Sequence, residues 1–538
     1  MPAEAPPDPG QAPDLAGLLN VLPLLWSLLG VPDRRALRTC CRATRRTADQ
    51  QLDALSACHS GLPRTDWRLH LAARAIRGAL ERGARPRRLE LRLQLTRSSA
   101  FDKFRRLVLS RLGAMAPPAL TDVRLHRVPL TSEVVQGLTA AAPRLTVLRL
   151  SGYELPCCGC MPCTWAAHEA LASVRALLRH AAPQLEELEL GLTGGLAAEP
   201  WLPAALQQCS RLARLSLGEV PGEAALGALG ALPRLRALAL RGVTGRDRLS
   251  GLAGLTALTA LSLDAAPEAA LPAVAALHGL ARLELAGCAL RPEGLLLLAG
   301  LPQLRHLHVE TVALPRQQAT PADGGGGGAA AAAAAAEAAE ATDEPEPLPL
   351  PPRLEVLELG GPIHPGALAA LRPAGPLELL LWPRCVLLER EADQDPYGRL
   401  QPAAAEALLG ACGQLAGRTR AACLSLSWPK APYSWGPARY GVLFAALAPA
   451  ALVVLELRSV VLWGADVAAL AQHLPTLQVL HLICHAPLPA WPLLRRLPRL
   501  RELRLHPGMG NMADIWEEFG DEQGCPVRLW LWPLALMG

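Results

Sequence analysis

The sequence has little lysine, little charge overall and few aromatic rings. Only Lys103 and Lys430 are lysines, so 51 of the 53 cationic side chains are arginines. Charged residues make up 19% of the chain, below the roughly 25% of typical soluble domains, and only 4 Phe and 4 Tyr are present. A chain that is 51% hydrophobic is not expected to be disordered. Its apolar residues are mostly Leu and Ala, which argues against a sandwich with an aromatic-rich core.

The chain also lacks a strong net charge and a signal peptide. A net charge of +5 over 538 residues does not favour a nucleic-acid-binding protein. No positively charged region precedes an apolar run at the N-terminus, so the 14 cysteines are expected to be free thiols in a reducing compartment. The uncharged run Leu15–Val31 is 17 residues long, barely membrane length, and leaves a membrane anchor as an alternative. We expect a cytoplasmic protein without membrane contact, with nuclear, ciliary or cytoskeletal locations as alternatives.

A repeated pattern of leucines occupies most of the chain. From Leu212, the first leucines of successive L-x-x-L-x-L motifs are 23, 23, 22 and 24 residues apart. Weaker copies start at Leu120, Leu377 and Ala421. The clear copies start at Leu145, Leu185, Leu212, Leu235, Leu258, Leu280, Leu304, Leu354, Leu452, Leu477 and Leu500.

These spacings fall within the period of about 20–29 residues of leucine-rich repeats. Over residues 86–510 the sequence resembles a leucine-rich-repeat protein of the ribonuclease-inhibitor-like and F-box-associated type. The resemblance implies an α/β solenoid with short parallel strands on a concave face and helices on the convex face. In each x-L-x-L the leucines point inward and the residues between them face solvent. Prolines two residues before a first leucine are expected to stop the preceding helix, at Pro143, Pro183, Pro233, Pro302, Pro352, Pro475 and Pro498.

A short helical segment is expected before the repeats, at residues 12–60. It resembles an F-box, the motif that docks the adaptor of a cullin ubiquitin ligase. Alanine replaces the usual leading leucine at Ala12, and Thr44 or Arg45 replaces the usual tryptophan. The alternative is a helical cap over the first repeat. The residues that match and would bind the adaptor are Pro13, Leu15, Leu18, Leu22, Leu25, Leu28, Leu29, Asp33, Leu37 and Cys41.

The remaining boundaries follow from breaks in the repeat. Residues 1–11 are expected to be disordered, and 61–314 to form a first repeat block with a Cys-rich insert at 153–168. The Pro/Gly/Ala/Glu-rich segment 315–352 is predicted to be a disordered linker. A second repeat block at 353–510 contains an insert at 383–420, and 511–538 is expected to form a C-terminal cap.

The Cys-rich insert offers a weak candidate for zinc binding, formed by Cys157, Cys160, Cys163 and His168. Strong zinc signatures have two separated ligand pairs, and this segment has a single cluster, so no metal or other cofactor is expected. No nucleophile elbow, phosphate-binding loop, kinase motif or zinc-protease motif is present. The sequence therefore predicts a protein without enzymatic activity or a small-molecule substrate.

The solvent-facing strand positions are the better candidates for a binding site. Their mixed charge suits a protein partner more than a phosphate backbone, which needs a stripe of one sign. In any solenoid these positions are polar, and this plainer interpretation stays open for each residue. The candidates are Arg149, Glu187, Glu189, Arg214, Arg241, Asp264, Arg282, Glu284, His306, His308, Glu310, Glu358, Glu456, Arg458, His481, Glu502, Arg504 and His506.

The sequence thus favours a substrate-recognition subunit of a cullin-type ubiquitin ligase. In this hypothesis residues 12–50 bind the adaptor and the concave face holds an unknown target protein. The alternative is a leucine-rich-repeat scaffold of a cytoskeletal, ciliary or signalling assembly, in which the N-terminal helices act only as a cap.

Overall fold

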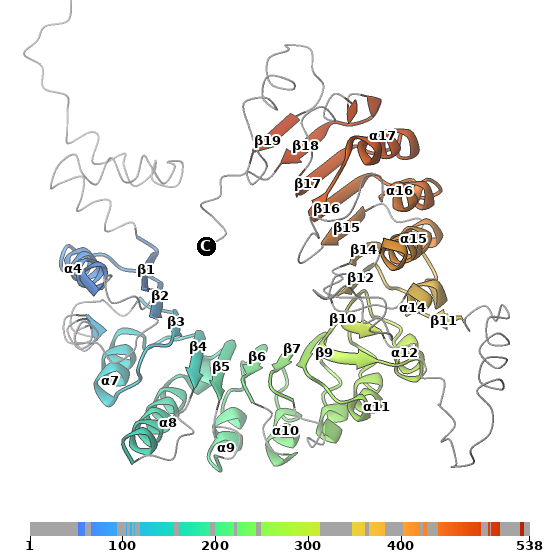
Figure 1. Ribbon diagram of the computed structural model, residues 1–538. Helices are drawn as coiled ribbons and strands as arrows, with labels where there is room; N and C mark the ends of the chain where they lie inside the picture. Colours follow the sequence, from blue (N-terminus) through green and yellow to red (C-terminus); the bar gives the residue numbers. More distant parts are fainter. Residues whose placement is uncertain are drawn as a thin grey trace, which may run out of the picture. The chain divides into compact units, whose positions relative to one another are not determined.

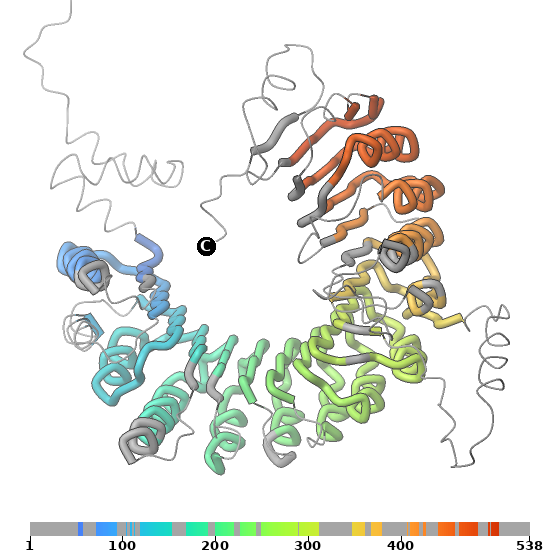
Figure 2. The backbone as a smooth tube through the Cα atoms, in the orientation of Figure 1, coloured from blue at the N-terminus to red at the C-terminus, as the bar shows by residue number. Residues whose placement is uncertain are grey.

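A computed structural model divides the chain into two compact units, Met1–Arg241 and Gly242–Gly538. It describes residues 52–59, 66–93, 104, 108–109, 112, 119–154, 161–193, 199–219, 223–243, 249–312, 347–360, 365–381, 402–419, 423–427, 440–485, 493–494, 496–505 and 528–531. Each unit is an α/β stack in which helices follow one face of a parallel sheet (Figure 1). Figure 2 shows the regular spacing of successive strand–helix turns within each unit.

The first unit contains seven described strands, each hydrogen-bonded in parallel to the next. They are β1 (Ala54–His59), β2 (Arg88–Leu93), β3 (Asp122–His126), β4 (Val147–Glu154), β5 (Glu187–Thr193), β6 (Arg214–Leu217) and β7 (Ala237–Leu240). The helices are α4 (Asp66–Glu81), α7 (Ser132–Ala141), α8 (Met161–Ala181), α9 (Leu202–Gln207) and α10 (Glu223–Leu229). Helices α7 to α10 pack side by side in that order.

The second unit continues the same plan. Its parallel sheet contains β8 (Ala260–Asp264), β9 (Arg282–Leu290), β10 (His306–Val312), β12 (Val356–Leu359), β14 (Glu378–Leu381), β15 (Cys423–Ser427), β16 (Val454–Val461), β17 (Val479–His485), β18 (Glu502–Leu505) and β19 (Arg528–Leu531). A separate parallel pair is formed by β11 (Leu348–Pro349) and β13 (Leu371–Arg372). The helices are α11 (Leu271–Ala275), α12 (Pro292–Ala299), α14 (Pro365–Ala370), α15 (Pro402–Thr419), α16 (Gly441–Leu447) and α17 (Gly464–His473).

The core of each unit is a ladder of strand leucines. Leu148, Leu188, Leu215 and Leu238 lie opposite one another along β4 to β7, and each is at most 2% exposed. Burying one such side chain stabilises the fold by about 1.5–3 kcal/mol. The ladder confirms the α/β class and the leucine-rich-repeat architecture that the spacing predicts.

One backbone carbonyl per repeat fixes where the next strand starts. The carbonyl of Thr121 accepts hydrogen bonds from the amides of both Thr146 and Val147, at 2.9 and 3.0 Å. The hydroxyl of Thr146 adds a third bond to the same oxygen at 3.1 Å. The preceding repeat has the same arrangement, because the carbonyl of Arg87 accepts hydrogen bonds from the amides of Thr121 and Asp122.

The prolines expected to stop the helices lie a few residues before the strands. Pro143, Pro233, Pro302 and Pro475 each stand in a turn between a helix and the following strand.

A left-handed turn recurs two residues after the last strand leucine. It occurs at Arg127, Gly152, Gly242, Ala265 and Gly287, whose φ angles lie between 55° and 75°. Successive turns stack closely, because a Cβ on Gly287 would lie 3.1 Å from the Cα of Ala265. Glycine adopts this conformation without strain, whereas an alanine does so at a cost of about 1 kcal/mol.

Five segments differ from the sequence prediction or extend it. Residues 54–59 fall inside the segment expected to be helical, but they form β1 in parallel register with β2. The copy assigned to Leu377 is out of register by one residue, because Leu379 pairs with Leu357 of β12. At the end of the expected linker, β11 pairs with β13, and Leu348 and Leu350 are buried.

The two remaining differences concern the second repeat block. Helix α15 occupies the C-terminal part of the expected insert at 383–420 and packs between α14 and α16. Within the expected C-terminal cap, β19 adds one more parallel strand, with Leu529 opposite Leu503. Within the described residues, none of the helices is both long and apolar enough to cross a membrane.

Candidate protein-interaction face

The sheet of each unit has one face that the described helices leave uncovered. This open sheet face consists of the strand residues that alternate with the buried leucines, and it corresponds to the concave face expected from the sequence (Figure 1). Side chains on it form rows across the strands, since every strand pairs in register with the next.

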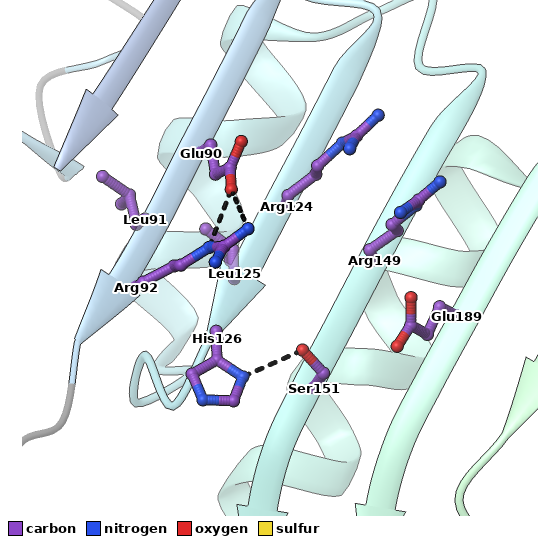
Figure 3. Close-up of a pocket in the computed structure, with 9 residues that line it drawn as sticks. All are labelled: Glu90, Leu91, Arg92, Arg124, Leu125, His126, Arg149, Ser151 and Glu189. Carbon is purple, nitrogen blue, oxygen red and sulfur yellow. Dashed lines mark hydrogen bonds and ion pairs between the residues drawn. The ribbon is translucent and has the colours of Figure 1, made fainter. Parts of the chain in front are cut away.

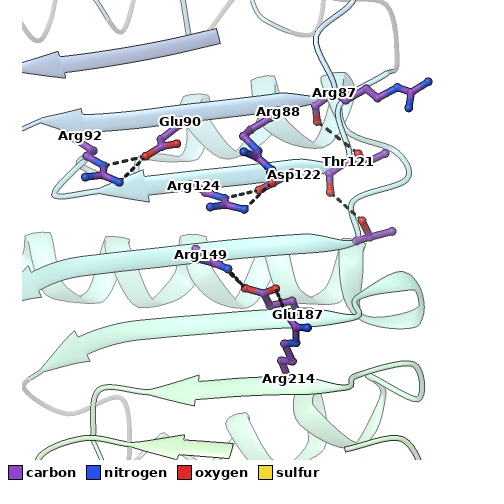
Figure 4. Close-up of polar contacts among 11 residues, drawn as sticks. Arg87, Arg88, Glu90, Arg92, Thr121, Asp122, Arg124, Arg149, Glu187 and Arg214 are labelled. Atoms are coloured by element: carbon purple, nitrogen blue, oxygen red, sulfur yellow. Dashed lines mark hydrogen bonds and ion pairs between the residues drawn. The ribbon is translucent and has the colours of Figure 1, made fainter. Parts of the chain in front are cut away.

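In the first unit, arginines surround the carboxylates on this face. Asp122 accepts hydrogen bonds from Arg88 on the neighbouring strand at 2.7 Å and from Arg124 on its own strand at 3.0 Å (Figure 4). On β5, Glu187 bonds to Arg149 at 2.5 Å and lies 3.6 Å from Arg214. These contacts tie consecutive repeats together. As partly exposed pairs, each contributes about 0–1 kcal/mol to stability.

A shallow pocket of about 260 Å³ lies within this network. Its lining comes from four consecutive strands: Glu90, Leu91, Arg92, Arg124, Leu125, His126, Arg149, Ser151 and Glu189 (Figure 3). The central position of each strand, between its two buried leucines, is occupied from β2 to β5 by Glu90, Arg124, Arg149 and Glu189. Arg124 and Arg149 therefore stand directly side by side.

At neutral pH the positive charge of the pocket comes from arginine alone. Burial lowers the pKa of His126, and the nearby charges of Arg127 and Arg92 lower it further. The neutral ring hydrogen-bonds through Nδ1 to the hydroxyl of Ser151 at 3.1 Å. The hydrogen bond to Asp122 raises the pKa of Arg124, which therefore stays charged.

In the second unit, histidines take the place of several arginines. The Glu358 carboxylate lies 3.3 Å from Nδ1 of His308 and 3.6 Å from Nε2 of His306. The latter separation is too long for a hydrogen bond, and Nε2 of His306 has no partner among the described residues. Burial lowers the pKa of His306, and Arg282 lowers it further, whereas Glu358 and Glu284 act in the opposite direction. His306 is therefore neutral at pH 7.

Two further clusters on the second unit resemble this arrangement. His481 lies 2.9 Å from Glu456, which also accepts a hydrogen bond from Ser425 at 3.0 Å. On β18, Arg504 pairs with Glu502 on the same strand at 2.7 Å. On the strand positions of this face, acidic residues outnumber arginines.

The structure places the sequence candidates on this face, except for His506, which lies outside the described residues. Arg458 occupies the expected position on β16, in register with Ser427. Sequence reasoning missed further charged or titratable positions on the same face, among them Arg88, Glu90, Arg92, Asp122, Arg124, His126, Glu378 and Cys423. Strand β2 was missed because Pro86 stands where the first leucine belongs, although its alternation of charged and leucine residues was visible.

The other candidate sites lie largely beyond the described residues. All ten F-box-like positions precede Leu52, where the description of the chain begins, and Cys157 and Cys160 also lie outside it. Cys163 falls within α8, and His168 on that helix is exposed. No cluster of three potential metal ligands occurs among the described residues.

Comparison with known proteins gives one distant structural similarity. No protein-family model matches the chain, and no curated protein matches it. Among solved structures, an internalin from Listeria monocytogenes is 16% identical, with 71% of this chain and 86% of that chain covered and a TM-score of 0.31.

Proposed function

We propose that this chain is the substrate-recognition subunit of a cullin-type ubiquitin ligase. Its open sheet face would hold the target protein, and residues 12–50 would bind the ligase adaptor. The observation that carries the binding role is the uncovered sheet face of each unit, with charged side chains at regular positions. The F-box-like pattern from Pro13 to Cys41 supports the ligase role.

The charge of this face suits a protein partner. The first unit carries both signs of charge on this face, with six arginines and four carboxylates: Arg88, Arg92, Arg124, Arg149, Arg214, Arg241, Glu90, Asp122, Glu187 and Glu189. Nucleic-acid binding requires a stripe of positive charge along the phosphate backbone. A folded protein or an extended peptide presents both signs, so it can pair with both.

The test is capture of purified cullin adaptor by the full chain. Wild-type protein is expected to retain the adaptor, and the double variant Leu25→Asp/Leu37→Asp is expected to lose it, because both leucines belong to the F-box-like pattern. The matched control is Leu296→Asp/Leu297→Asp, which introduces the same charges at exposed positions of α12, where the leucines are 52% and 42% exposed. It should bind as wild type does.

Failure of wild-type protein to retain the adaptor would contradict the ligase role. The N-terminal helices would then be interpreted as a cap, and the chain as a binding scaffold. Equal loss in the α12 control would show that the added charges act through solubility or folding, and not through an adaptor contact.

A further inference from the structure

The central row of the first unit contains an electrostatic contact that the fold alone does not favour. Along it, Glu90, Arg124, Arg149 and Glu189 occupy directly opposed positions on β2 to β5. At the two outer steps of this row, residues of opposite charge stand in register, and at the middle step two arginines stand side by side (Figure 3). Like charges directly opposite one another destabilise a sheet. An anion between Arg124 and Arg149 would complete an alternating row of charges.

Both arginines are held in position by a carboxylate in the neighbouring row. Arg124 donates from Nε and Nη2 to Asp122, and Arg149 donates from Nε to Glu187 (Figure 4). Their Nη1 groups have no hydrogen-bond partner within the described part of the chain. A guanidinium group offers five N–H donors, so each arginine keeps donors for a ligand while its orientation is fixed. Such pre-organisation lowers the entropy cost of binding.

Neutral hydrogen-bonding groups flank the arginine pair on the next row. His126 and Ser151 hold each other by a hydrogen bond of 3.1 Å. Gly152 lets the chain approach closely at this point, because a Cβ there would lie only 2.6 Å from Cε1 of His126. In the tautomer that carries its proton on Nδ1, His126 donates to the Ser151 hydroxyl, which keeps its own proton to donate to a bound anion.

Volume and charge define the ligand. At about 260 Å³, the pocket lies below the range of roughly 300–1,000 Å³ that small-molecule sites occupy, but it admits an amino-acid side chain. Its lining carries three arginines, Arg92, Arg124 and Arg149, and two carboxylates, Glu90 and Glu189, for a net charge of +1. A single carboxylate neutralises this charge.

We propose that this pocket binds an acidic side chain of an extended partner peptide, with its carboxylate between the guanidinium groups of Arg124 and Arg149. The inference rests on the proposed function only in requiring that the open sheet face bind a protein. It adds the chemistry of recognition: an Asp or Glu of the target enters the arginine pair, and Ser151 provides one further hydrogen bond.

The test measures binding of a fluorescein-labelled decapeptide of alternating Glu and Ser to the full chain, by fluorescence anisotropy. Three further probes keep the same length: a Gln/Ser peptide, a Lys/Ser peptide, and a Gln/Ser peptide with one phosphoserine. The Arg124→Ala/Arg149→Ala variant is expected to bind the Glu/Ser peptide at least tenfold more weakly than wild type. Arg77→Ala is the control, because Arg77 lies on helix α4, away from the open sheet face, and pairs with Glu81 on the same helix. Peptide binding by this variant should be unchanged.

Charge reversal gives a second readout that loss of folding cannot imitate. The Arg124→Glu/Arg149→Glu variant is expected to lose the Glu/Ser peptide and to gain binding of the Lys/Ser peptide. Melting of each variant, followed by circular dichroism, identifies any that fail to fold. Binding of the Gln/Ser peptide equal to that of the Glu/Ser peptide would overturn the proposal. So would unchanged binding in the double alanine variant, binding of the phosphoserine peptide alone, or no binding of any peptide.

These outcomes are independent of adaptor capture. If the acidic peptide binds through the arginine pair but the adaptor is not retained, the pocket stands and the ligase role fails. If the adaptor is retained but peptide binding ignores the arginines, the ligase role stands and the pocket assignment fails.

Discussion

A single buried carboxylate fixes the start of two successive helices in the second unit. Asp466, in the first turn of α17, is 0% exposed. Its Oδ2 accepts a hydrogen bond from the amide of Trp463 at 3.0 Å, and its Oδ1 accepts one from the amide of Tyr440 at 2.8 Å. Tyr440 immediately precedes α16. Asp466→Ala should therefore disturb the ends of both helices at once.

The magnitude follows from the groups that the substitution leaves unpaired. Each buried amide left without a partner costs about 1–3 kcal/mol, so the two amides account for about 2–6 kcal/mol. Removal of a negative charge from a helix N-terminus adds about 0.5 kcal/mol. We expect a loss of about 3–4 kcal/mol in the free energy of unfolding. With a urea m-value of about 3 kcal/mol/M, the unfolding midpoint of this unit should fall by about 1 M.

The assay is urea unfolding followed by circular dichroism and tryptophan fluorescence. Asp466→Asn keeps one acceptor oxygen and should give a smaller loss than Asp466→Ala. The control is Glu293→Ala, which removes an exposed acid from the first turn of α12 and should cost no more than about 0.5 kcal/mol. If Asp466→Ala lowers the midpoint no more than Glu293→Ala does, the carboxylate does not hold the two helices and this reasoning is wrong.

Three further predictions concern stability. A Cβ at Gly413 of α15 would lie 2.6 Å from the Cβ of Ala446 on α16, so Gly413→Ala should cost about 1–3 kcal/mol in urea unfolding, whereas Gly254→Ala, with open space around it, should not. Ala265 has a φ of 58°, so Ala265→Gly should raise the free energy of unfolding by about 0.5–1 kcal/mol, and a lowered melting temperature would contradict this. His306 has a lowered pKa in the folded state, so below pH 6.5 the unfolded chain binds the proton first and stability should fall with decreasing pH. In His306→Gln, unfolding measured from pH 7 to 5 should show a smaller decline, and an equal decline would refute the assignment.

The sequence predicted the repeat architecture where leucines alternate with other residues. At Leu261, Leu283 and Leu307 the alternation is strict, and these residues lie opposite one another as expected. Around Leu377 the prediction failed, because 377–381 contains four leucines and only Glu378 breaks the run. With leucines at neighbouring positions, the sequence pattern does not define which residues of this strand face the core. A shift of one residue exchanges the two faces of a strand. The left-handed turns were missed for a different reason, since Arg127 and Ala265 occupy a position that favours glycine.

Most ion pairs between strands on the open sheet face could not be predicted from the sequence, because they depend on the register between neighbouring strands. Contacts between residues two apart on one strand, such as Arg282 with Glu284 and Arg504 with Glu502, follow from the period of a strand alone. The contacts of Arg88 with Asp122 and of Arg149 with Glu187 join residues 34 and 38 apart, across repeats of unequal length. Only the aligned strands show which carboxylates neutralise which arginines. The same alignment shows that Arg124 and Arg149 are neighbours of like charge, so the contact that most needs an external anion cannot be found by counting charges along the sequence.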